Sequence, residues 1–256
     1  SVTWKVANDP TSALSGQVYR NLGGNTSTDQ SNVGVNFGSV VLGGTGDYIQ
    51  ATFDYAFEAA PSIITTPPPN FNQAFNFFRF GLYTNSSTST HYEDDKGYLG
   101  DLSYWDNTSN PPYKFGEFSV REEANIYNHT GGPLDYSSVL LDNKSATDYG
   151  PPTPPADGDV VSIARVAKTS IDSINTKYTA TLLITKTASG VDVVLKRDGS
   201  VVASGSAITP YYTFDTLYFE GPSNSNGFAV DNLLITTNVP EPTRLLLLGL
   251  GCCGLV

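Results

Sequence analysis

The stretch that decides the fold is YTATLLITK (residues 178–186), followed by ASG (188–190) and VDVVLK (191–196). Apolar and polar residues alternate in the first run, which is typical of a β-strand with one buried face. The ASG segment predicts a turn, and the next run predicts the returning strand. Asp198-Gly199 predicts a second tight turn into a strand at 201–203, because these residue types tolerate positive φ. Two consecutive hairpins predict an antiparallel meander.

Similar strand signals extend outward from this meander. Residues 47–58 alternate most regularly in the first half of the chain. Residues 75–84 are apolar on both faces, which predicts a central strand. Further strands are expected at 2–7, 33–42, 97–105, 115–121, 214–220 and 228–236, with a polar loop from residue 8 to residue 32. The sequence therefore predicts an all-β fold, a single antiparallel β-sandwich domain over residues 1–237.

Composition narrows the range of partners. The 256-residue chain carries 25 acidic and 14 basic residues, a net charge of -11, which disfavours nucleic acid and anionic membrane surfaces. Neutral glycans, or acidic glycans bridged by cations, remain compatible with this charge. The two cysteines are Cys252 and Cys253, so the predicted domain contains no disulfide. The start at Ser1 and the absence of methionine fit an exported chain whose signal peptide has been removed.

The end of the chain differs in composition from the rest. Two prolines around a glutamate predict an extended hinge at residues 238–244, since proline has no amide donor. The run 245–256 contains no charged residue and is rich in leucine and glycine, which predicts a short apolar helix. As a helix it is roughly 18 Å long, shorter than a membrane core of about 30 Å. A last core helix or a disordered tail is the other interpretation.

Pro240, Glu241 and Pro242 with the apolar run resemble the PEP-CTERM sorting signal of bacterial exported proteins. In that family the motif precedes a short transmembrane helix and a terminal arginine cluster, and the arginine cluster is absent from this sequence. The resemblance implies export, recognition by an exosortase-type membrane protease, and delivery to the cell surface or extracellular matrix. It also implies that the chain meets a membrane only through its C-terminal tail.

A second resemblance concerns the last 80 residues of the predicted domain. The meander ending in Arg197-Asp198-Gly199, then FDTL (214–217), then FAVDNLLI (228–235), is similar to concanavalin A-like jelly rolls of the laminin G or lectin type. Such domains often end in an Asp-Asn strand and often precede a PEP-CTERM signal. The fold hosts lectins, glycoside hydrolases, polysaccharide lyases and adhesive modules, so it does not select among them.

Aromatic residues gather between residues 91 and 118 and are interleaved with Asp and Asn. Aromatic rings stack on the C–H faces of sugars, while Asn and Asp bind hydroxyl groups. This segment is therefore the predicted carbohydrate-binding surface, although Tyr and Trp also pack on half-buried strands. Its proposed contact residues are Tyr92, Tyr98, Tyr104, Trp105 and Tyr113.

Catalysis is an alternative with less support. Glucanases of this fold place carboxylates at alternate positions of one strand, and that triplet is absent, since the adjacent Glu122 and Glu123 point to opposite faces. Polysaccharide lyases of this fold use His, Tyr and Arg. His91-Tyr92 is the candidate base and acid pair, with Arg79 on a strand. The plainer interpretation of His91 is an exposed loop residue.

Calcium is a candidate cofactor. Asp94 and Asp95 belong to an acidic loop that offers hard oxygen ligands, although the loop does not match the twelve-residue calcium-loop pattern. Asp231, in the Asp-Asn strand, is a second candidate by resemblance to jelly rolls that hold a structural calcium ion. A solvated acidic loop is the alternative interpretation of the first group.

These patterns together predict an exported, non-catalytic protein of the cell surface or extracellular matrix that binds polysaccharide through aromatic loops. The first alternative is a structural subunit that binds copies of itself by strand addition at an open sheet edge or through its tail. The second alternative is a polysaccharide lyase or glycoside hydrolase of the same fold.

Overall fold

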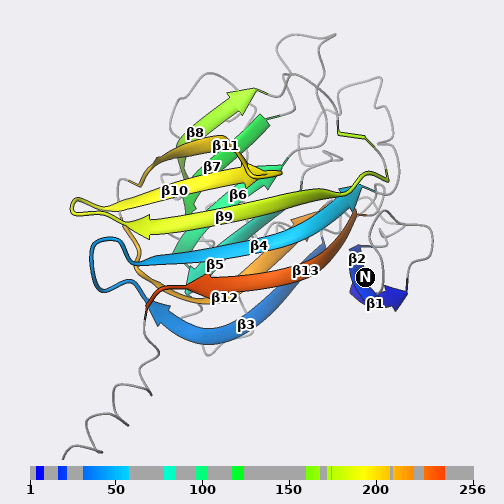
Figure 1. The fold of residues 1–256 in the computed structure, drawn as a ribbon, viewed down its shortest axis with the longest axis horizontal. Helices are drawn as coiled ribbons and strands as arrows, with labels where there is room; N and C mark the ends of the chain where they lie inside the picture. The colour runs from blue at the N-terminus through cyan, green and yellow to red at the C-terminus, as the bar shows by residue number, and fades with distance from the viewer. Residues whose placement is uncertain are drawn as a thin grey trace, which may run out of the picture.

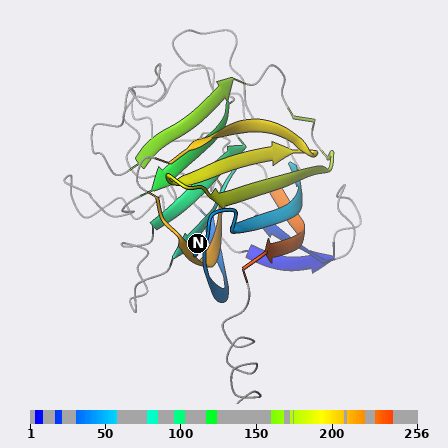
Figure 2. The same ribbon diagram turned by 60° about the vertical axis from the view of Figure 1, so that its left-hand side comes forward.

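The described residues form two antiparallel β-sheets that lie face to face (Figure 1). The computed structural model of the chain describes residues 4–8, 17–21, 31–57, 78–84, 96–102, 117–123, 160–167, 172–173, 175–207, 210–221 and 228–239. Within them every element is a β-strand, which confirms the predicted all-β class and antiparallel sandwich for this part of the chain. Figure 2 shows the two layers from a second direction.

Sheet A has seven strands, and neighbours in the following order are hydrogen-bonded: β1 (Trp4–Asn8), β2 (Gln17–Asn21), β13 (Phe228–Thr237), β4 (Tyr48–Phe57), β9 (Tyr178–Lys186), β10 (Val191–Arg197) and β11 (Ser200–Ser206). Sheet B has six strands in the order β3 (Ser31–Val41), β12 (Thr213–Gly221), β5 (Arg79–Thr84), β6 (Lys96–Leu102), β7 (Glu117–Glu123) and β8 (Val160–Ala167).

The predicted meander is confirmed as the sequence of neighbours β9, β10 and β11. Between β10 and β11, Asp198 and Gly199 both adopt positive φ, 49° and 79°. These values match the right-handed twist of the strands that a two-residue hairpin joins. At the other end of β10, the amide of Thr187 donates to the carbonyl of Gly190 at 2.8 Å and closes the turn.

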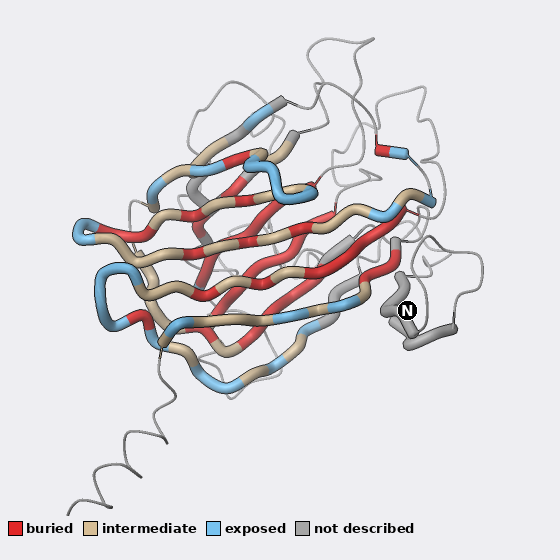
Figure 3. Tube along the Cα trace, viewed as in Figure 1, coloured by how far each residue is buried: buried red, intermediate tan, exposed pale blue. Residues whose placement is uncertain are grey.

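Inward residues of strands from both sheets pack against each other and form the core (Figure 3). Phe53 of β4 lies at its centre, with its ring edge-on to Phe80 of β5 at 4.6 Å and to Phe219 of β12 at 5.0 Å between ring centroids. Such edge-to-face pairs stabilise beyond the burial of their area. The predicted inward face of residues 49–57 is confirmed, because Ile49, Ala51, Phe53, Tyr55 and Phe57 are all buried.

One strand differs from the prediction. Residues 17–21 were expected to lie in a polar loop and instead form β2, which pairs with β1 and with the start of β13. The segment QVYRN is short and mostly polar, so its strand conformation depends on two partners that are distant in sequence. Local alternation carries no signal for pairing of this kind.

The C-terminal end of sheet A is tied to the body beyond residue 237. The side-chain Oδ1 of Asn238 accepts a hydrogen bond from the amide of Tyr48 at 2.8 Å, and its Nδ2 donates to the carbonyl of Gly46 at 3.1 Å. Val239 packs against the core. The first two residues of the predicted hinge therefore belong to the sandwich, while residues 240–256, including the predicted helix, lie outside the described residues.

Among the described residues, no helix is long and apolar enough to cross a membrane.

Candidate functional site

The outward faces of the two sheets differ in accessibility. Outward positions of the inner strands of sheet B are enclosed, because Tyr83 of β5, Leu99 of β6 and Tyr218 of β12 are almost fully buried. Most outward positions of β4, β9 and the end of β13 are half-buried or exposed, as the tan and blue segments show in Figure 3, whereas Asp54, Ala56 and Ala229 are buried. The outward face of sheet A is therefore the broad surface that the described strands offer to a ligand.

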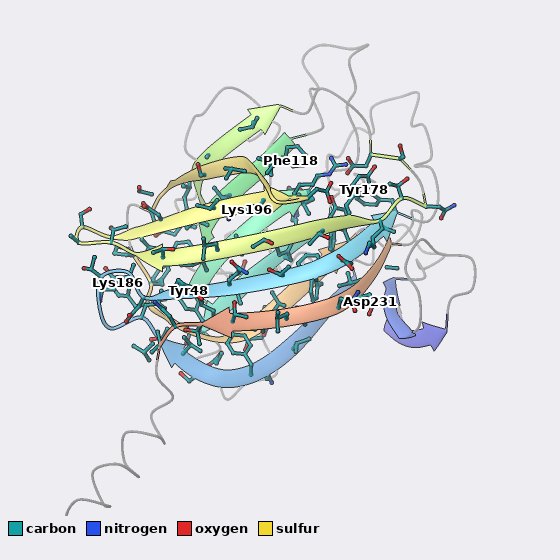
Figure 4. All side chains as sticks on the ribbon, viewed as in Figure 1. Tyr48, Phe118, Tyr178, Lys186, Lys196 and Asp231 are labelled. Carbon is teal, nitrogen blue, oxygen red and sulfur yellow. The ribbon has the colours of Figure 1, made fainter. Side chains whose placement is uncertain are left out.

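We call this surface the sheet A face. It carries hydroxyl and amide groups with aliphatic side chains between them, and its members are Gln50, Thr52, Asp54, Thr179, Thr181, Leu183, Thr185, Asp192, Val194, Lys196, Leu234 and Thr236. Figure 4 shows these side chains as sticks on the ribbon and labels Lys196 on β10.

Cross-strand register arranges these side chains in rows. One row runs across four strands through Leu234, Thr52, Thr181 and Lys196. The next row runs through Thr236, Gln50, Leu183 and Val194. Directly opposite residues of an antiparallel pair share a face, so each row is continuous over these four strands. The rows bring apolar and hydrogen-bonding groups together at regular spacing.

Hydrogen bonds hold the polar part of these rows in place. The hydroxyl groups of Thr52 and Thr181 are 3.2 Å apart across β4 and β9. Nε2 of Gln50 donates to Oγ1 of Thr52 at 3.1 Å. Threonine has few rotamers in a strand, so these groups are ordered before any ligand arrives. Leu234, which is 57% exposed, adds an aliphatic contact at the end of the row.

Asp54 anchors one end of the sheet A face. Its Oδ1 accepts a hydrogen bond from Thr179 Oγ1 at 2.6 Å, and its Oδ2 accepts from Asn232 Nδ2 at 2.9 Å and Lys177 Nζ at 3.3 Å. Burial by itself raises the pKa of Asp54, but hydrogen bonds from Thr179, Asn232 and Lys177 and the charge of Lys177 outweigh it and lower the pKa below its usual value. The carboxylate is thus ionised, and both of its oxygens accept hydrogen bonds from neighbouring side chains.

A β-bulge in β13 turns Asn232 onto Asp54. The register between β13 and β4 shifts between Asp231 and Leu234, and Asn232 has a φ of 53°. Asparagine tolerates this left-handed conformation better than most residues. The amide of Asn232 donates to Oδ1 of Asp231 at 2.7 Å, which fixes the bulge. The bulge therefore supplies Asp54 with a donor that a regular strand would not.

Asp231, a predicted calcium ligand, lies at this bulge opposite Asp54 (Figure 4). One of its carboxylate oxygens already accepts the Asn232 amide. Across the described ranges no group of three His, Cys, Asp or Glu side chains is arranged to hold a metal ion. Asp94 and Asp95, the other predicted ligands, lie outside the described residues.

Behind this end of the face, the core is closed by a charged cluster. The guanidinium of Arg197 lies 3.9 Å from the ring centroid of Tyr178 and pairs with Asp172 at 2.5 Å. The amide of Ser173 donates to the hydroxyl of Tyr178 at 2.8 Å. Burial raises the pKa of the neighbouring Tyr55, and the negative charge of Asp172 raises it further. These contacts hold Asp172, Ser173 and Tyr178 against the sandwich and so position Lys177 and Thr179.

Tyr98, predicted to contact sugar, is a core residue. Its ring is fully buried beside Tyr211 and Phe214, at centroid distances of 6.0 Å and 6.1 Å. The amide of Tyr211 donates to its hydroxyl at 2.7 Å. Because inward positions of β6 face the core, Tyr98 has no exposed ring face for stacking and does not belong to an aromatic binding surface.

Arg79, considered above for a lyase, is also enclosed. Its Nε lies 3.2 Å from Oδ2 of Asp101, and both side chains are almost fully buried. A guanidinium paired in this way is not available to an acidic sugar at the surface. The remaining predicted site residues lie outside the described residues: Tyr92, Tyr104, Trp105, Tyr113, His91, Pro240, Glu241 and Pro242.

The sequence carries a local signal for the sheet A face. Its polar members alternate with core residues in residues 47–58 and 178–186, the two runs with the clearest strand pattern. Only pairing shows that the polar halves of these runs are neighbours, through contacts such as Thr52 with Thr181.

No protein-family model matches the sequence, and no curated protein matches it. Solved structures do match the fold. The Ca2+-bound exoplasmic/lumenal domain of VIP36 aligns with a TM-score of 0.50 and 8% identity, over 94% of this chain and 84% of that chain. The carbohydrate recognition domain of Emp47p aligns with a TM-score of 0.49 and 10% identity, over 92% and 89%. The carbohydrate-binding module CBM66 from Bacillus subtilis aligns with a TM-score of 0.42 and 12% identity, over 92% and 91%.

At 8% identity the likeness to VIP36 speaks for architecture alone. It agrees with the two antiparallel sheets and single core described above. The chain has the β-sandwich fold of lectin-type domains.

Proposed function

We propose that this protein is an exported, non-catalytic module that binds polysaccharide at a cell surface or in an extracellular matrix. The observation that carries the proposal is the sheet A face, an accessible array of ordered hydroxyl and amide groups with aliphatic side chains between them. A polysaccharide presents the complementary chemistry, which is hydroxyl groups and C–H faces. The lectin-type fold adds support for this class of ligand.

The charge of the protein favours a neutral polysaccharide. Asp54 is ionised and accepts hydrogen bonds from three side chains, and the positive charge of Lys177 compensates part of its negative charge. With a net charge of -11 on the whole chain, an anionic polymer would be repelled unless cations screened the contact. We therefore propose neutral glucans, mannans or xylans as the first ligands to test.

Cosedimentation with insoluble and high-molecular-weight polysaccharides tests the proposal. We expect the wild-type protein to pellet with at least one neutral polysaccharide. The variant Thr52→Val/Thr181→Val keeps the branched shape but removes two hydroxyl groups, and two lost hydrogen bonds should weaken binding about fivefold or more. Thr213→Val on β12, away from the sheet A face, is the matched control and should bind as the wild type does.

The loop aromatics remain a separate part of the proposal. Tyr104→Ala and Trp105→Ala should each weaken binding if these rings stack on sugar. Loss of binding in these variants with full binding by Thr52→Val/Thr181→Val would move the site from the sheet A face to the loops. Failure of the wild type to bind any polysaccharide in the panel would overturn the function itself.

Export and sorting through Pro240, Glu241 and Pro242 also belong to the proposal. In a bacterium with an exosortase-type protease, we expect the wild-type protein in the envelope or matrix fraction. Replacing Glu241 by Ala should shift it toward the other cell fractions. An unchanged distribution would contradict the sorting role and leave polysaccharide binding untouched.

The catalytic alternative has a direct test. A lyase acting on uronate polymers generates an unsaturated product with strong ultraviolet absorbance, and that signal should disappear in His91→Ala. We expect no product from acidic polysaccharides, because Arg79 is paired and buried. Product formation that depends on His91 would replace the non-catalytic proposal with an enzymatic one.

A structural calcium ion held by Asp94, Asp95 or Asp231 is the last part of the proposal. Carboxylate oxygens suit calcium, and a bound ion stabilises the folded state by mass action. We expect calcium to raise Tm after treatment with a chelator, and Asp231→Asn to reduce the increase. A Tm that does not respond to calcium would contradict the metal site.

A further inference from the structure

The two sheets have four outer strands, and two of them come together. β11 ends sheet A and β8 ends sheet B. A side-chain carbon added at Gly205 of β11 would lie 2.7 Å from Cγ2 and 3.0 Å from the carbonyl oxygen of Ile163 in β8. The backbones therefore approach so closely that this side of the sandwich is closed to another strand.

The other two outer strands, β1 and β3, differ in length and charge. β1 has five residues and includes Lys5. β3 has eleven residues, SNVGVNFGSVV, with no charged residue and no proline. Natural proteins protect long edge strands with charges or prolines, because unpaired amides and carbonyls accept a further strand. β3 has neither protection.

β3 pairs with β12 alone among the described strands, and it runs along the lower rim of the sandwich in Figure 1. Its register with β12 is regular over residues 31–36 and shifts farther along, where residues 37–39 oppose Asp215. Gly34, Asn36 and Gly38 are exposed, and Val41 is 51% exposed. Phe37 and Val40 pack only partly against the core. The register is regular over residues 31–36, and Gly34 and Asn36 within this part are exposed.

We propose that β3 is an interface at which two copies of this chain pair edge to edge. Antiparallel pairing of residues 31–36 with the same residues of a second copy would join the two six-stranded sheets into one continuous sheet. Such an interface uses the same strand from each copy and closes as a two-fold dimer. Main-chain hydrogen bonds supply the affinity, as in other forms of strand addition.

The uncharged sequence of β3 lets a second copy approach this edge although the protein as a whole is acidic. Each chain carries a net charge of -11, so two copies repel each other over most orientations. β3 is an uncharged strand of this acidic protein, and its outward side chains in the regular part are small or neutral. Pairing through β3 therefore avoids placing like charges directly opposite each other, which destabilises a sheet.

Asn36→Lys tests the interface. Asn36 is exposed, and its one described hydrogen bond is accepted from Thr216 Oγ1 at 3.1 Å, so the fold should tolerate the change. In the proposed register each lysine would lie opposite Ser31 of the second copy, one at each end of the paired segment. A lysine on an edge strand disfavours the addition of another strand, so self-association should weaken about tenfold or more. Asn36→Ser is the matched uncharged control, and Val201→Lys, at a position 57% exposed on β11, is the charge control.

Sedimentation velocity over a range of concentrations measures the result, with circular dichroism to confirm folding. We expect dimers for the wild type, Asn36→Ser and Val201→Lys, and monomers for Asn36→Lys. Hydrogen exchange of amides 31–36 should slow as the wild-type concentration rises. A monomeric wild type, or equal association of Asn36→Lys, would overturn the proposal. If the monomeric variant Asn36→Lys still binds polysaccharide, polysaccharide binding does not require self-association. Either proposal can then fail without the other.

Discussion

The phenolic oxygen of Tyr98 in β6 accepts a hydrogen bond from the backbone amide of Tyr211 at 2.7 Å. This bond connects sheet B to the segment that leads into β12, and burial raises the pKa of Tyr98 far above its usual value. Tyr98→Phe would keep the ring and leave the Tyr211 amide without its acceptor. We expect the free energy of unfolding to fall by about 1–3 kcal/mol, measured by urea denaturation. Polysaccharide affinity should not change, and a large loss of affinity in a folded variant would return Tyr98 to the binding surface.

Acid should reveal the contribution of Asp54. Its folded-state pKa lies below the usual value, so its stabilising effect is complete above the unfolded pKa of about 3.9 and is lost as pH falls through the folded value. We expect Asp54→Asn to be about 1–3 kcal/mol less stable than the wild type at neutral pH. The difference should shrink below about pH 4, as measured by urea denaturation at several pH values. A difference that is constant with pH would contradict the role of the ionised carboxylate.

Phe53 should dominate the core. It is fully buried and makes edge-to-face contacts with Phe80 and Phe219 of the opposite sheet. Phe53→Ala would leave a cavity between the sheets, and we expect a loss of about 3–5 kcal/mol in the free energy of unfolding. Leu234→Ala, at an exposed position on sheet A, should cost less than about 0.5 kcal/mol. Similar losses for the two variants would contradict the packing described here.

Gly97 should not tolerate alanine. A side-chain carbon there would lie 2.1 Å from the carbonyl oxygen of Leu82 and 2.8 Å from the ring of Tyr83. The backbone of β5 cannot move away without breaking its pairing with β6, so we expect Gly97→Ala to lower the free energy of unfolding by about 1–3 kcal/mol or more. Gly38→Ala is the control, because no atom lies within 4 Å of its added carbon. Thermal unfolding of both variants measures the contrast.

The ion pair of Arg79 and Asp101 should stabilise the protein only while both partners are present. Their side chains are 5% and 2% exposed, so removal of one charge leaves the other buried. We expect Asp101→Asn to lower the free energy of unfolding by about 3–5 kcal/mol. Lys177→Met, which removes an exposed partner of Asp54, should cost about 1 kcal/mol or less. Chemical denaturation of both variants tests whether burial decides the cost.

Local pattern was sufficient to predict most strands. Alternation placed residues 49–57 with the correct inward face, and Asp198-Gly199 marked a hairpin whose positive φ values the structure contains. The apolar segment ending at Thr84 was predicted as a central strand, and β5 lies between β12 and β6. These features depend on the preferences of adjacent residues. β2 was missed because its conformation depends on pairing with β1 and β13.

The candidate site, in contrast, could not be predicted from local sequence pattern. Composition directed attention to the aromatic residues between 91 and 118, and of the five proposed contacts the described residues include Tyr98 alone, which is buried. The Asp54 cluster joins Lys177, Thr179 and Asn232 from distant parts of the chain. No short-range pattern indicates such a cluster, because it depends on strand pairing and on the bulge at Asn232.

The sequence by itself determined the all-β class, the central meander and the alternation that gives each strand a buried face, because each depends on neighbouring residues and the period of a strand. Tertiary structure decided which polar faces are accessible, which carboxylate accepts hydrogen bonds from three side chains and which strands lie at the edges of the described sheets. Those properties arise from pairs such as Thr52 with Thr181 and Gly205 with Ile163. They become neighbours only when the sheets form and pack.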